Sequence, residues 1–324
     1  MKRLLRSCLI TITVSLLAWP AAAAGPKKVV VVTVTLGFRH SSIPTAEKIL
    51  QKLADESKAF TIVEFARQPE VQVPRRPSKP RAPKPDADEK ARAKYAADLK
   101  KYEADAARWT PEMQARTTAA ENEFKAQAAA SLQPLSPANL ARIDGVIFAN
   151  TTGDLPLPDK EGFIQWVRNG GVWIGMHSAS DTLHGFAPFI EMIGGEFQTH
   201  GAQVAVELLK MDKDHPATRG LPDPWQIARE EMYLFKNYTR GQQRDLWSMA
   251  VHPNTKEPGH HPVSWVKQFG KGRIFYTSLG HREDIWDADP NLKDRINSPD
   301  VAQKYQQHIL GGIKWALGLG DGNQ

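Results

Sequence analysis

The segment GGVWIGMHSASDTLHG, residues 170–185, carries the clearest structural signal in the chain. After two glycines it continues as an apolar run, residues 172–176, and then changes into a cluster of His, Ser and Asp. The small residues Gly175 and Ala179 flank a projecting position, which is the spacing of a strand-to-helix elbow. His177 occupies that position. The segment predicts a buried strand that delivers a histidine at its carboxyl end.

Other apolar runs predict further strands that alternate with helices. The strands are expected over residues 29–35, 60–65 and 145–149, and helices after Ser42 and over residues 159–169. Ser42 is a residue type that caps helices. Alternation of this kind produces right-handed βαβ units. We predict an α/β fold with a doubly wound, mostly parallel sheet, in which ligands bind beyond the carboxyl ends of the strands.

The carboxyl-terminal third departs from strict alternation. Residues 204–209, 263–268 and 273–277 predict strands, the last two joined as a hairpin, and residues 301–317 predict a final helix with an apolar face. We expect these segments to extend the same domain, which spans residues 25–320.

Residues 1–24 have the features of a signal peptide. Basic residues precede a short apolar run, and the segment ends in small residues. The alternative is a membrane anchor, but the run is shorter than the roughly 20 residues that a bilayer needs, so no stable membrane span is expected after cleavage. We predict a periplasmic or secreted protein. The single cysteine, Cys8, lies in this segment, which excludes thiol catalysis in the mature chain.

The chain is basic, with a formal net charge of +6 and a pI near 9.2. Part of the excess belongs to the signal segment and part to residues 69–137, and export argues against nucleic acid as a partner. We therefore expect a small-molecule partner rather than a nucleic acid.

Residues 69–137 form a segment of different composition. Its first part is rich in Pro and basic residues and predicts an extended, solvated chain. Residues 89–130 predict two helices, the second starting after Thr110, with an apolar stripe on the first. We interpret the segment as an inserted helical hairpin. Its stripe either packs the two helices together as a spacer or docks a protein or cell-envelope partner.

Polar residues follow several of the predicted strands, and together they predict a site at one edge of the sheet. Those residues are Arg39, His40, Thr152, Gly153, His177 and Asp181. A histidine at an elbow suits acid–base chemistry or metal ligation. Ser178 is an alternative nucleophile, but adjacent residues on an elbow point in different directions, which disfavours a serine-hydrolase triad.

Further along the chain, His200, Glu231, Tyr233 and His281 fall in or beside predicted loops. With His177 they contain the ligand types of a zinc-like centre, but no HExxH pattern accompanies them. Without a signature spacing these residues do not specify a cofactor, and a site that holds a divalent ion such as zinc is the alternative to a metal-free one.

The chain resembles the ThuA-like (trehalose-utilisation) family, which has the fold of the class I glutamine amidotransferases. The resemblance rests on FRHSSIP, ANTTGDLPL, FIQWVRNGG, WIGMHSASDT, GGEFQTHG, DHPATRGLP, EEMYLF, HHPVSWV, GKGRIFYTSLGH and ILGGIKWALG. In the amidotransferases the elbow holds the cysteine that attacks glutamine, whereas here it holds His177. An imidazole cannot replace that thiolate, so glutaminase activity is excluded.

The resemblance implies a role with disaccharides or keto-sugars. We predict an exported hydrolase or lyase with His177 and Glu231 as an acid–base pair, assisted by His200 and Asp181. The substrate-binding residues would be Arg39, His40, Thr152, Gly153, Tyr233 and His281. Trp265 either offers a face to a sugar ring or belongs to the core. The rival hypothesis is a non-catalytic periplasmic sugar-binding or scaffold protein.

Overall fold

The computed structural model describes residues 25–319, so the predicted signal peptide lies outside the described residues. A nine-stranded mixed sheet forms its centre. In sheet order the strands are β2 (Phe60–Ala66), β1 (Lys27–Val32), β3 (Gly145–Ala149), β4 (Val172–Met176), β11 (Gly272–Thr277), β10 (Pro258–Phe269), β9 (Arg244–Val251), β6 (Val204–Lys210) and β7 (Trp225–Glu230). The strands from β2 to β11 are parallel, and from β11 to β7 each neighbouring pair is antiparallel. The expected α/β class is confirmed.

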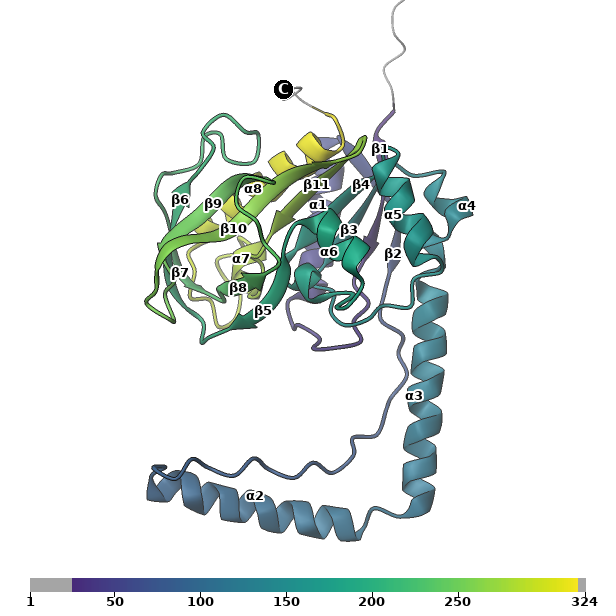
Figure 1. The fold of residues 1–324 in the computed structure, drawn as a ribbon, viewed down its shortest axis with the longest axis vertical. Coiled ribbons are helices and arrows are strands. Elements are labelled where there is room, and N and C mark those ends of the chain that lie inside the picture. The colour runs from purple at the N-terminus through teal and green to yellow at the C-terminus, as the bar shows by residue number, and fades with distance from the viewer. Residues whose placement is uncertain (1–24, 320–324) are drawn as a thin grey trace, which may run out of the picture.

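Helices cover both faces of this sheet, as Figure 1 shows. They are α1 (Ile43–Ser57), α4 (Pro137–Leu140), α5 (Lys160–Arg168), α6 (Ala187–Ile193), α7 (Glu283–Trp286) and α8 (Pro299–Ala316), with short 3-10 turns η1 (Gln133–Leu135) and η2 (His177–Asp181). A small second sheet pairs β5 (Glu196–His200) with β8 (Tyr233–Lys236).

Two apolar cores lie on the opposite faces of the sheet. Val29 and Val31 of β1 belong to the core beneath α1 and α8, whereas Val30 and Val32 belong to the core beneath α5 and α6. Side chains alternate across a strand, so a strand that is buried on both faces has to be apolar throughout. The unbroken β-branched run of β1 is therefore explained by the helices on both sides.

Helix α1 begins at the expected place but without the expected cap. Ser42 makes no side-chain hydrogen bond to the first turn. Its hydroxyl instead donates to the carbonyl of Gly280 at 3.3 Å and accepts from the side-chain amide of Asn150 at 2.9 Å. The prediction that Ser42 caps the helix is wrong, because its hydroxyl links loops at the carboxyl edge of the sheet.

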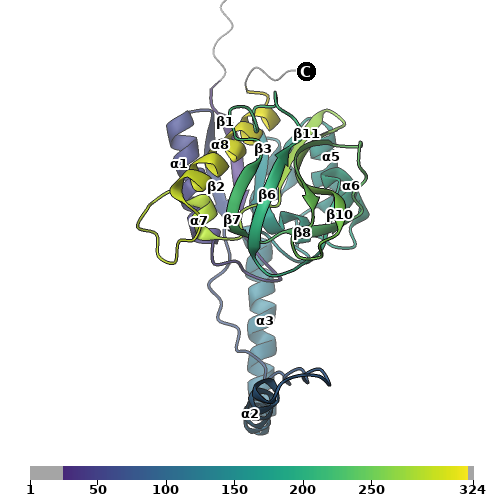
Figure 2. The same cartoon turned by 90° about the vertical axis from the view of Figure 1, so that its left-hand side faces the viewer.

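The inserted segment forms an arm that stands away from the sheet (Figures 1 and 2). It consists of α2 (Glu89–Ala107) and α3 (Pro111–Ser131), with the Thr110 hydroxyl accepting from the Met113 amide at 3.2 Å as the expected cap. The two helices do not lie side by side. The interpretation as a hairpin zipped by an apolar stripe is therefore wrong.

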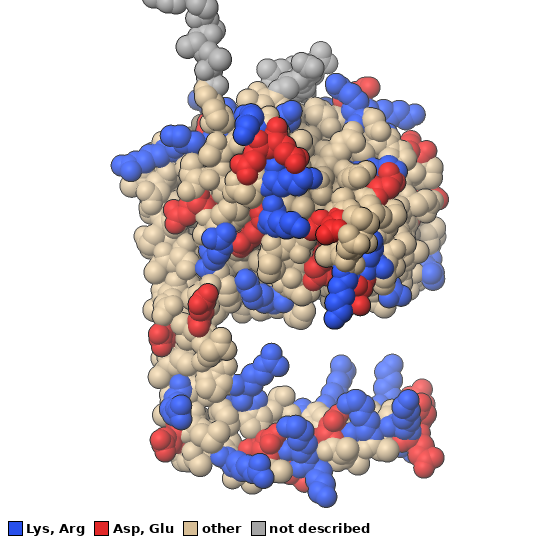
Figure 3. Space-filling model, turned by 180° about the vertical axis from the view of Figure 1, so that it is seen from behind, with Lys and Arg blue, Asp and Glu red and all other residues tan. Residues whose placement is uncertain are grey.

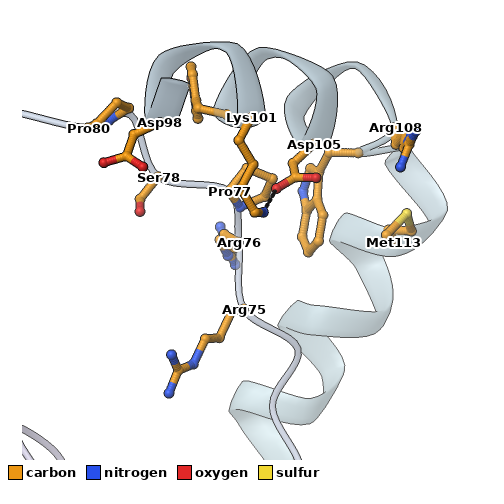
Figure 4. Close-up of a pocket in the computed structure, with 12 residues that line it drawn as sticks. Arg75, Arg76, Pro77, Ser78, Pro80, Asp98, Lys101, Asp105, Arg108 and Met113 are labelled. Atoms are coloured by element: carbon orange, nitrogen blue, oxygen red, sulfur yellow. Dashed lines mark hydrogen bonds and ion pairs between the residues drawn. The ribbon is translucent and has the colours of Figure 1, made fainter. Parts of the chain in front are cut away.

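The stripe on α2 faces the Pro-rich segment instead. Tyr102 and Trp109 line a groove together with Arg76 and Pro77. The close-up in Figure 4 shows Arg76 and Pro77 of the extended segment beside Lys101 and Asp105 of α2. Arg76 also forms an ion pair with Glu121 of α3 at 2.9 Å. Extended Pro-rich chain thus covers the half-buried face that a second helix was expected to cover.

The outer surface of the arm is strongly charged. Figure 3 shows Lys and Arg side chains along α2, interspersed with acidic ones. No residue of α2 is fully buried. Among the described residues no helix is both long and apolar enough to cross a bilayer.

Gly311 of α8 provides a test of how closely this helix packs. A Cβ atom there would lie 2.2 Å from the carbonyl oxygen of Pro216 and 2.8 Å from the Cα of Ala217, and neither backbone atom can rotate away. Gly→Ala in an exposed helix stabilises by about 1 kcal/mol. Here we expect Gly311→Ala to lower the free energy of unfolding by about 1–3 kcal/mol. Urea denaturation measures this, and an alanine variant as stable as the parent would contradict it.

Candidate functional site

Four chain segments meet at the carboxyl ends of the parallel strands. The loop after β1 carries His40, β4 leads directly into His177, the turn after β11 carries His281, and the link between β7 and β8 carries Glu231. The chain runs from the carboxyl end of β2 into the arm. The site and the arm therefore lie on the same side of the domain (Figure 1). We expected from the sequence that several loops would converge at this edge, and these four segments do so.

His177 has an unusual backbone for a residue with a Cβ atom. Its φ is +51°, in the left-handed region, at the turn from β4 into η2. Non-glycine residues adopt this conformation at a cost, and functional sites are where such strain concentrates. The elbow predicted from the flanking small residues is therefore present.

One hydrogen bond defines the proton on the His177 ring. Nδ1 lies 2.8 Å from the carbonyl oxygen of Ser278, which can only accept, so Nδ1 carries the hydrogen. In the neutral ring Nε2 then carries the lone pair. That lone pair faces Tyr233 Oη at 2.9 Å, His40 Nε2 at 3.1 Å and His281 Nδ1 at 3.2 Å.

Glu231 joins this group of rings from the other side. Its Oε2 atom lies 3.3 Å from His281 Nδ1 and 3.7 Å from His177 Nε2, while Oε1 lies 3.0 Å from His200 Nδ1. The hypothesis that His177 and Glu231 share one site is thus supported by their placement. His40, His177, Glu231 and His281 are called the His/Glu cluster below.

Burial determines the charge of the cluster. Burial, together with the neighbouring His40 and His281, holds the pKa of His177 well below its usual range. Burial also lowers the pKa of His40 to about 4. Although burial lowers the pKa of His281, the hydrogen bond and charge of Glu231 outweigh it and raise the pKa above its usual value. At neutral pH His40 and His177 therefore present neutral rings.

The carboxyl group next to Glu231 has a different role. Glu230 is fully buried, and its Oε1 accepts from the backbone amides of Gly280 and His281 at 2.8 Å each. Burial raises the pKa of Glu230 to about 7. These bonds fix the turn that carries His281.

Three of the predicted binding residues serve the loop rather than the cluster. The Thr152 hydroxyl donates to the carbonyl of Phe38 at 2.8 Å, and Gly153, at φ +82°, is so close to Gly37 that a Cβ atom would lie 2.8 Å from its amide nitrogen. The Arg39 guanidinium donates to the carbonyl of Thr33 at 2.9 Å. The structure brings none of these three residues into contact with the cluster.

Asp181 is also directed elsewhere. Its carboxylate lies 2.5 Å from Nε2 of His184, whose Nδ1 lies 2.5 Å from Glu196. The expectation that Asp181 orients the cluster residues finds no direct contact in the structure. Asp181 instead forms a separate charged group with His184 at the rim.

Because Asp181 and Glu196 flank His184, we expect the stability of the folded protein to depend on pH. Burial lowers the pKa of His184, but hydrogen bonds to Asp181 and Glu196 outweigh it and raise the pKa above 6.5. A raised folded pKa stabilises fully below the unfolded pKa, and the gain is lost as pH rises through the folded value.

We therefore expect His184→Gln to cost about 1 kcal/mol at pH 6, since the ring is partly exposed, and distinctly less at pH 9. Urea midpoints of both proteins at the two pH values measure the difference. A cost that grows with pH would contradict the assignment.

Phe38 and Ser278 lie at the site but escaped sequence reasoning. Phe38 is 68% exposed and packs its ring edge-on against His40 at 4.8 Å. Ser178, which the sequence offered only as an alternative nucleophile, has its Oγ 3.3 Å from His40 Nδ1. Ser278 contributes only its carbonyl oxygen, which no side-chain pattern reveals. Phe38, an aromatic residue directly before Arg39 and His40, was the one sequence feature that could have indicated a binding residue here.

Comparisons with known proteins agree with this architecture. A family model described as "Trehalose utilisation" (ThuA) matches residues 100–316. A ThuA-like protein from Parabacteroides merdae ATCC 43184 is similar in structure, with a TM-score of 0.57 at 18% identity, covering 92% of this chain and 93% of that one. A ThuA-like protein from Bacteroides uniformis ATCC 8492 gives 0.52 at 16% identity, covering 92% and 95%.

These structural likenesses show the shared fold alone, because the identities are low. Comparison with curated proteins gives no significant match. The family model, in contrast, covers more than half of the chain and includes His177, His200, Glu231 and His281 within its span. The protein therefore belongs to the ThuA family, whose description, trehalose utilisation, indicates a carbohydrate-related role.

Proposed function

We propose that the protein acts on a disaccharide or a keto-sugar derivative, as a hydrolase or lyase, through acid–base chemistry at the His/Glu cluster. The observation that carries the proposal is the placement of Glu231, which lies within 3.0 Å of His200 and 3.3 Å of His281 in one site. A carbohydrate role agrees with the family.

His200 and Glu231 are the best placed pair for proton transfer. His200 Nδ1 lies 2.9 Å from the carbonyl oxygen of Gly201 and 3.0 Å from the Glu231 carboxylate, and both oxygens are acceptors. Nε2 of the same ring is left to exchange a proton with substrate, and the side chain is 45% exposed. His177 is fully buried. We therefore assign proton exchange with substrate to His200, and to His177 the orientation of the cluster.

A keto-sugar suits this pair. A carbonyl on the sugar ring acidifies the neighbouring C–H, so His200 can remove that proton. The electron pair then forms a C=C bond while the glycosidic C–O bond at the next carbon breaks, and the departing oxygen takes up a proton from the imidazolium. Later addition of water to the alkene would give net hydrolysis.

Phe38 adds a face for the sugar ring. It is exposed and next to His40, and aromatic faces bind apolar faces of ligands. Trp265 does not serve this purpose, because it is fully buried. The alternative that placed Trp265 in the core is confirmed.

We infer in addition that the fold is doubly wound like that of the class I glutamine amidotransferases, with His177 at the elbow that holds their cysteine. Its left-handed backbone between β4 and η2 supports this. No cysteine occurs after Cys8, so glutaminase chemistry is excluded. Export and a partner for residues 89–130 stay predictions.

The test is a turnover assay on a panel of disaccharides and their keto derivatives, with products identified by mass spectrometry and affinities by calorimetry. We expect turnover of a keto-disaccharide by the wild-type protein. Tight binding without turnover across the panel would overturn the proposal and favour a non-catalytic sugar-binding protein.

A further inference from the structure

We propose that His40, His177, Glu231 and His281 bind one divalent transition-metal ion, with zinc as the best match. The inference deepens the proposed function by naming what the cluster holds. It stands on the geometry of the four side chains, and its test measures metal rather than turnover.

The spacing of the donor atoms fits a single ion. His177 Nε2 lies 3.1 Å from His40 Nε2 and 3.2 Å from His281 Nδ1, and all four donors lie within 4.8 Å of one another. Zinc bonds of 2.0–2.2 Å in a tetrahedron separate the ligand atoms by roughly 3.3–3.6 Å. Four of the separations, at 3.1, 3.2, 3.3 and 3.7 Å, lie around this range, and binding an ion would draw the remaining donors closer.

Hydrogen bonds alone satisfy the cluster poorly. Nε2 of His177 has one lone pair, because Nδ1 donates to Ser278, yet two ring nitrogens and the Tyr233 hydroxyl lie within 3.2 Å of it. One lone pair accepts one well-directed hydrogen. A cation that accepts electron pairs from all three rings and the carboxylate resolves this crowding.

The surroundings of the four ligands match those of metal sites. Metal-binding imidazoles commonly donate their second nitrogen to a carbonyl, as His177 does to Ser278. The second oxygen of Glu231 faces His200, which fixes the carboxylate as a one-oxygen ligand. Each ligand comes from a different loop at the carboxyl ends of the strands or beside them, so the fold supplies the site before any ion arrives.

The ligand set also selects the ion. Three imidazoles with one carboxylate suit zinc and neighbouring transition metals more than magnesium or calcium, which prefer oxygen. The side chain of His281 is 18% exposed, so the centre is open on that side. A divalent ion there would polarise a sugar carbonyl or activate a water.

The experiment uses the chain from residue 25 onward, produced without a polyhistidine tag. The protein is stripped with a chelator and titrated with Zn²⁺ by calorimetry, and separately loaded with Co²⁺ for absorption spectroscopy. We expect saturable uptake of about one ion per chain and, with Co²⁺, the visible bands of a low-coordinate site. Uptake no tighter than that of a ligand-deleted variant would overturn the proposal.

The variants identify the site. His177→Ala and His281→Ala should lose the bound ion. His200→Gln should keep it, because His200 contacts Oε1 of Glu231 rather than the Oε2 atom that faces His177 and His281. Thermal unfolding of each protein with and without Zn²⁺ gives a second readout, because an ion that binds only the folded state raises the midpoint. If His177→Ala fails to fold, the Co²⁺ spectrum of the wild-type protein and the shift of its unfolding midpoint with Zn²⁺ still show whether the metal site exists.

Failure of this inference differs from failure of the proposed function. A protein that binds zinc but turns over no sugar retains the metal site and loses the enzyme proposal. A metal-free protein with full turnover retains the enzyme and rejects the metal.

Discussion

Glu231→Gln should lower kcat on a keto-disaccharide by about 10²–10⁴-fold, the range that positioned acid–base groups contribute. Glutamine keeps the shape of the side chain and an oxygen for His200 Nδ1 to bond. It removes the negative charge that lies 3.0 Å from the ring which takes up the substrate proton in the proposed reaction. Substrate affinity should stay within a few-fold, since the ring face of Phe38 is unchanged. Steady-state kinetics together with calorimetry separate the two effects.

The matched control is Glu230→Gln. Glu230 is the adjacent carboxyl group, but it is fully buried and bonded to the amides of Gly280 and His281, so its effect should be mainly on stability. Equal losses of kcat in the two variants would contradict the assignment of Glu231. So would a Glu231→Gln variant whose only defect is a higher KM.

Trp265→Ala should lower the free energy of unfolding by about 3–5 kcal/mol. The side chain is fully buried, its Nε1 donates to the carbonyl of Ile193 at 2.7 Å, and its ring packs edge-on against Phe235 at a centroid distance of 5.2 Å. Alanine removes all of these contacts and leaves a cavity in the core beside β10. Urea denaturation measures the loss.

A pair of phenylalanine variants isolates the hydrogen bond. Trp265→Phe leaves the Ile193 carbonyl without its donor, which costs about 1–3 kcal/mol beyond the lost volume. Trp173 is equally buried, but its Nε1 has no hydrogen-bond partner within the described residues. Trp173→Phe should therefore cost less. A larger cost for Trp173→Phe, or sugar binding that depends on Trp265 in a protein of unchanged stability, would contradict this account.

The strongest patterns in the sequence predicted the parallel half of the sheet closely. Expected strands at 60–65, 145–149 and 172–176 correspond to β2, β3 and β4 within one residue. Strands β3 and β4 are buried at every residue, so burial leaves a local record in the sequence. The edge strand β2 is partly exposed, but its β-branched and aromatic residues still indicated a strand. Strands β5, β7, β8 and β9 were missed because they are partly exposed and carry charged residues, such as Arg229 within β7 and Arg244 at the start of β9.

In the arm, the sequence indicated which face of α2 is covered but not which segment covers it. The 3.6-residue stripe on α2 correctly indicated a face that needs cover, and Thr110 correctly marked the next helix. Periodicity does not say what provides the cover. Proline fixes an extended chain, and that chain, rather than α3, lies along the stripe.

At the site, the local pattern of residues 172–179 specifies the elbow and places a histidine on it. The apolar run before His177 predicts a buried strand, and the small residues on either side of His177 predict an elbow that carries its imidazole. Both predictions depend only on neighbouring residues in the chain. Tertiary structure alone decided the partners of that imidazole. Ser278 lies 101 residues away in the chain and contributes a backbone atom, while Thr152 and Asp181 were drawn into bonds with Phe38 and His184. Local sequence records which side chains are buried, but which polar atoms meet depends on how strands distant in the chain pack side by side.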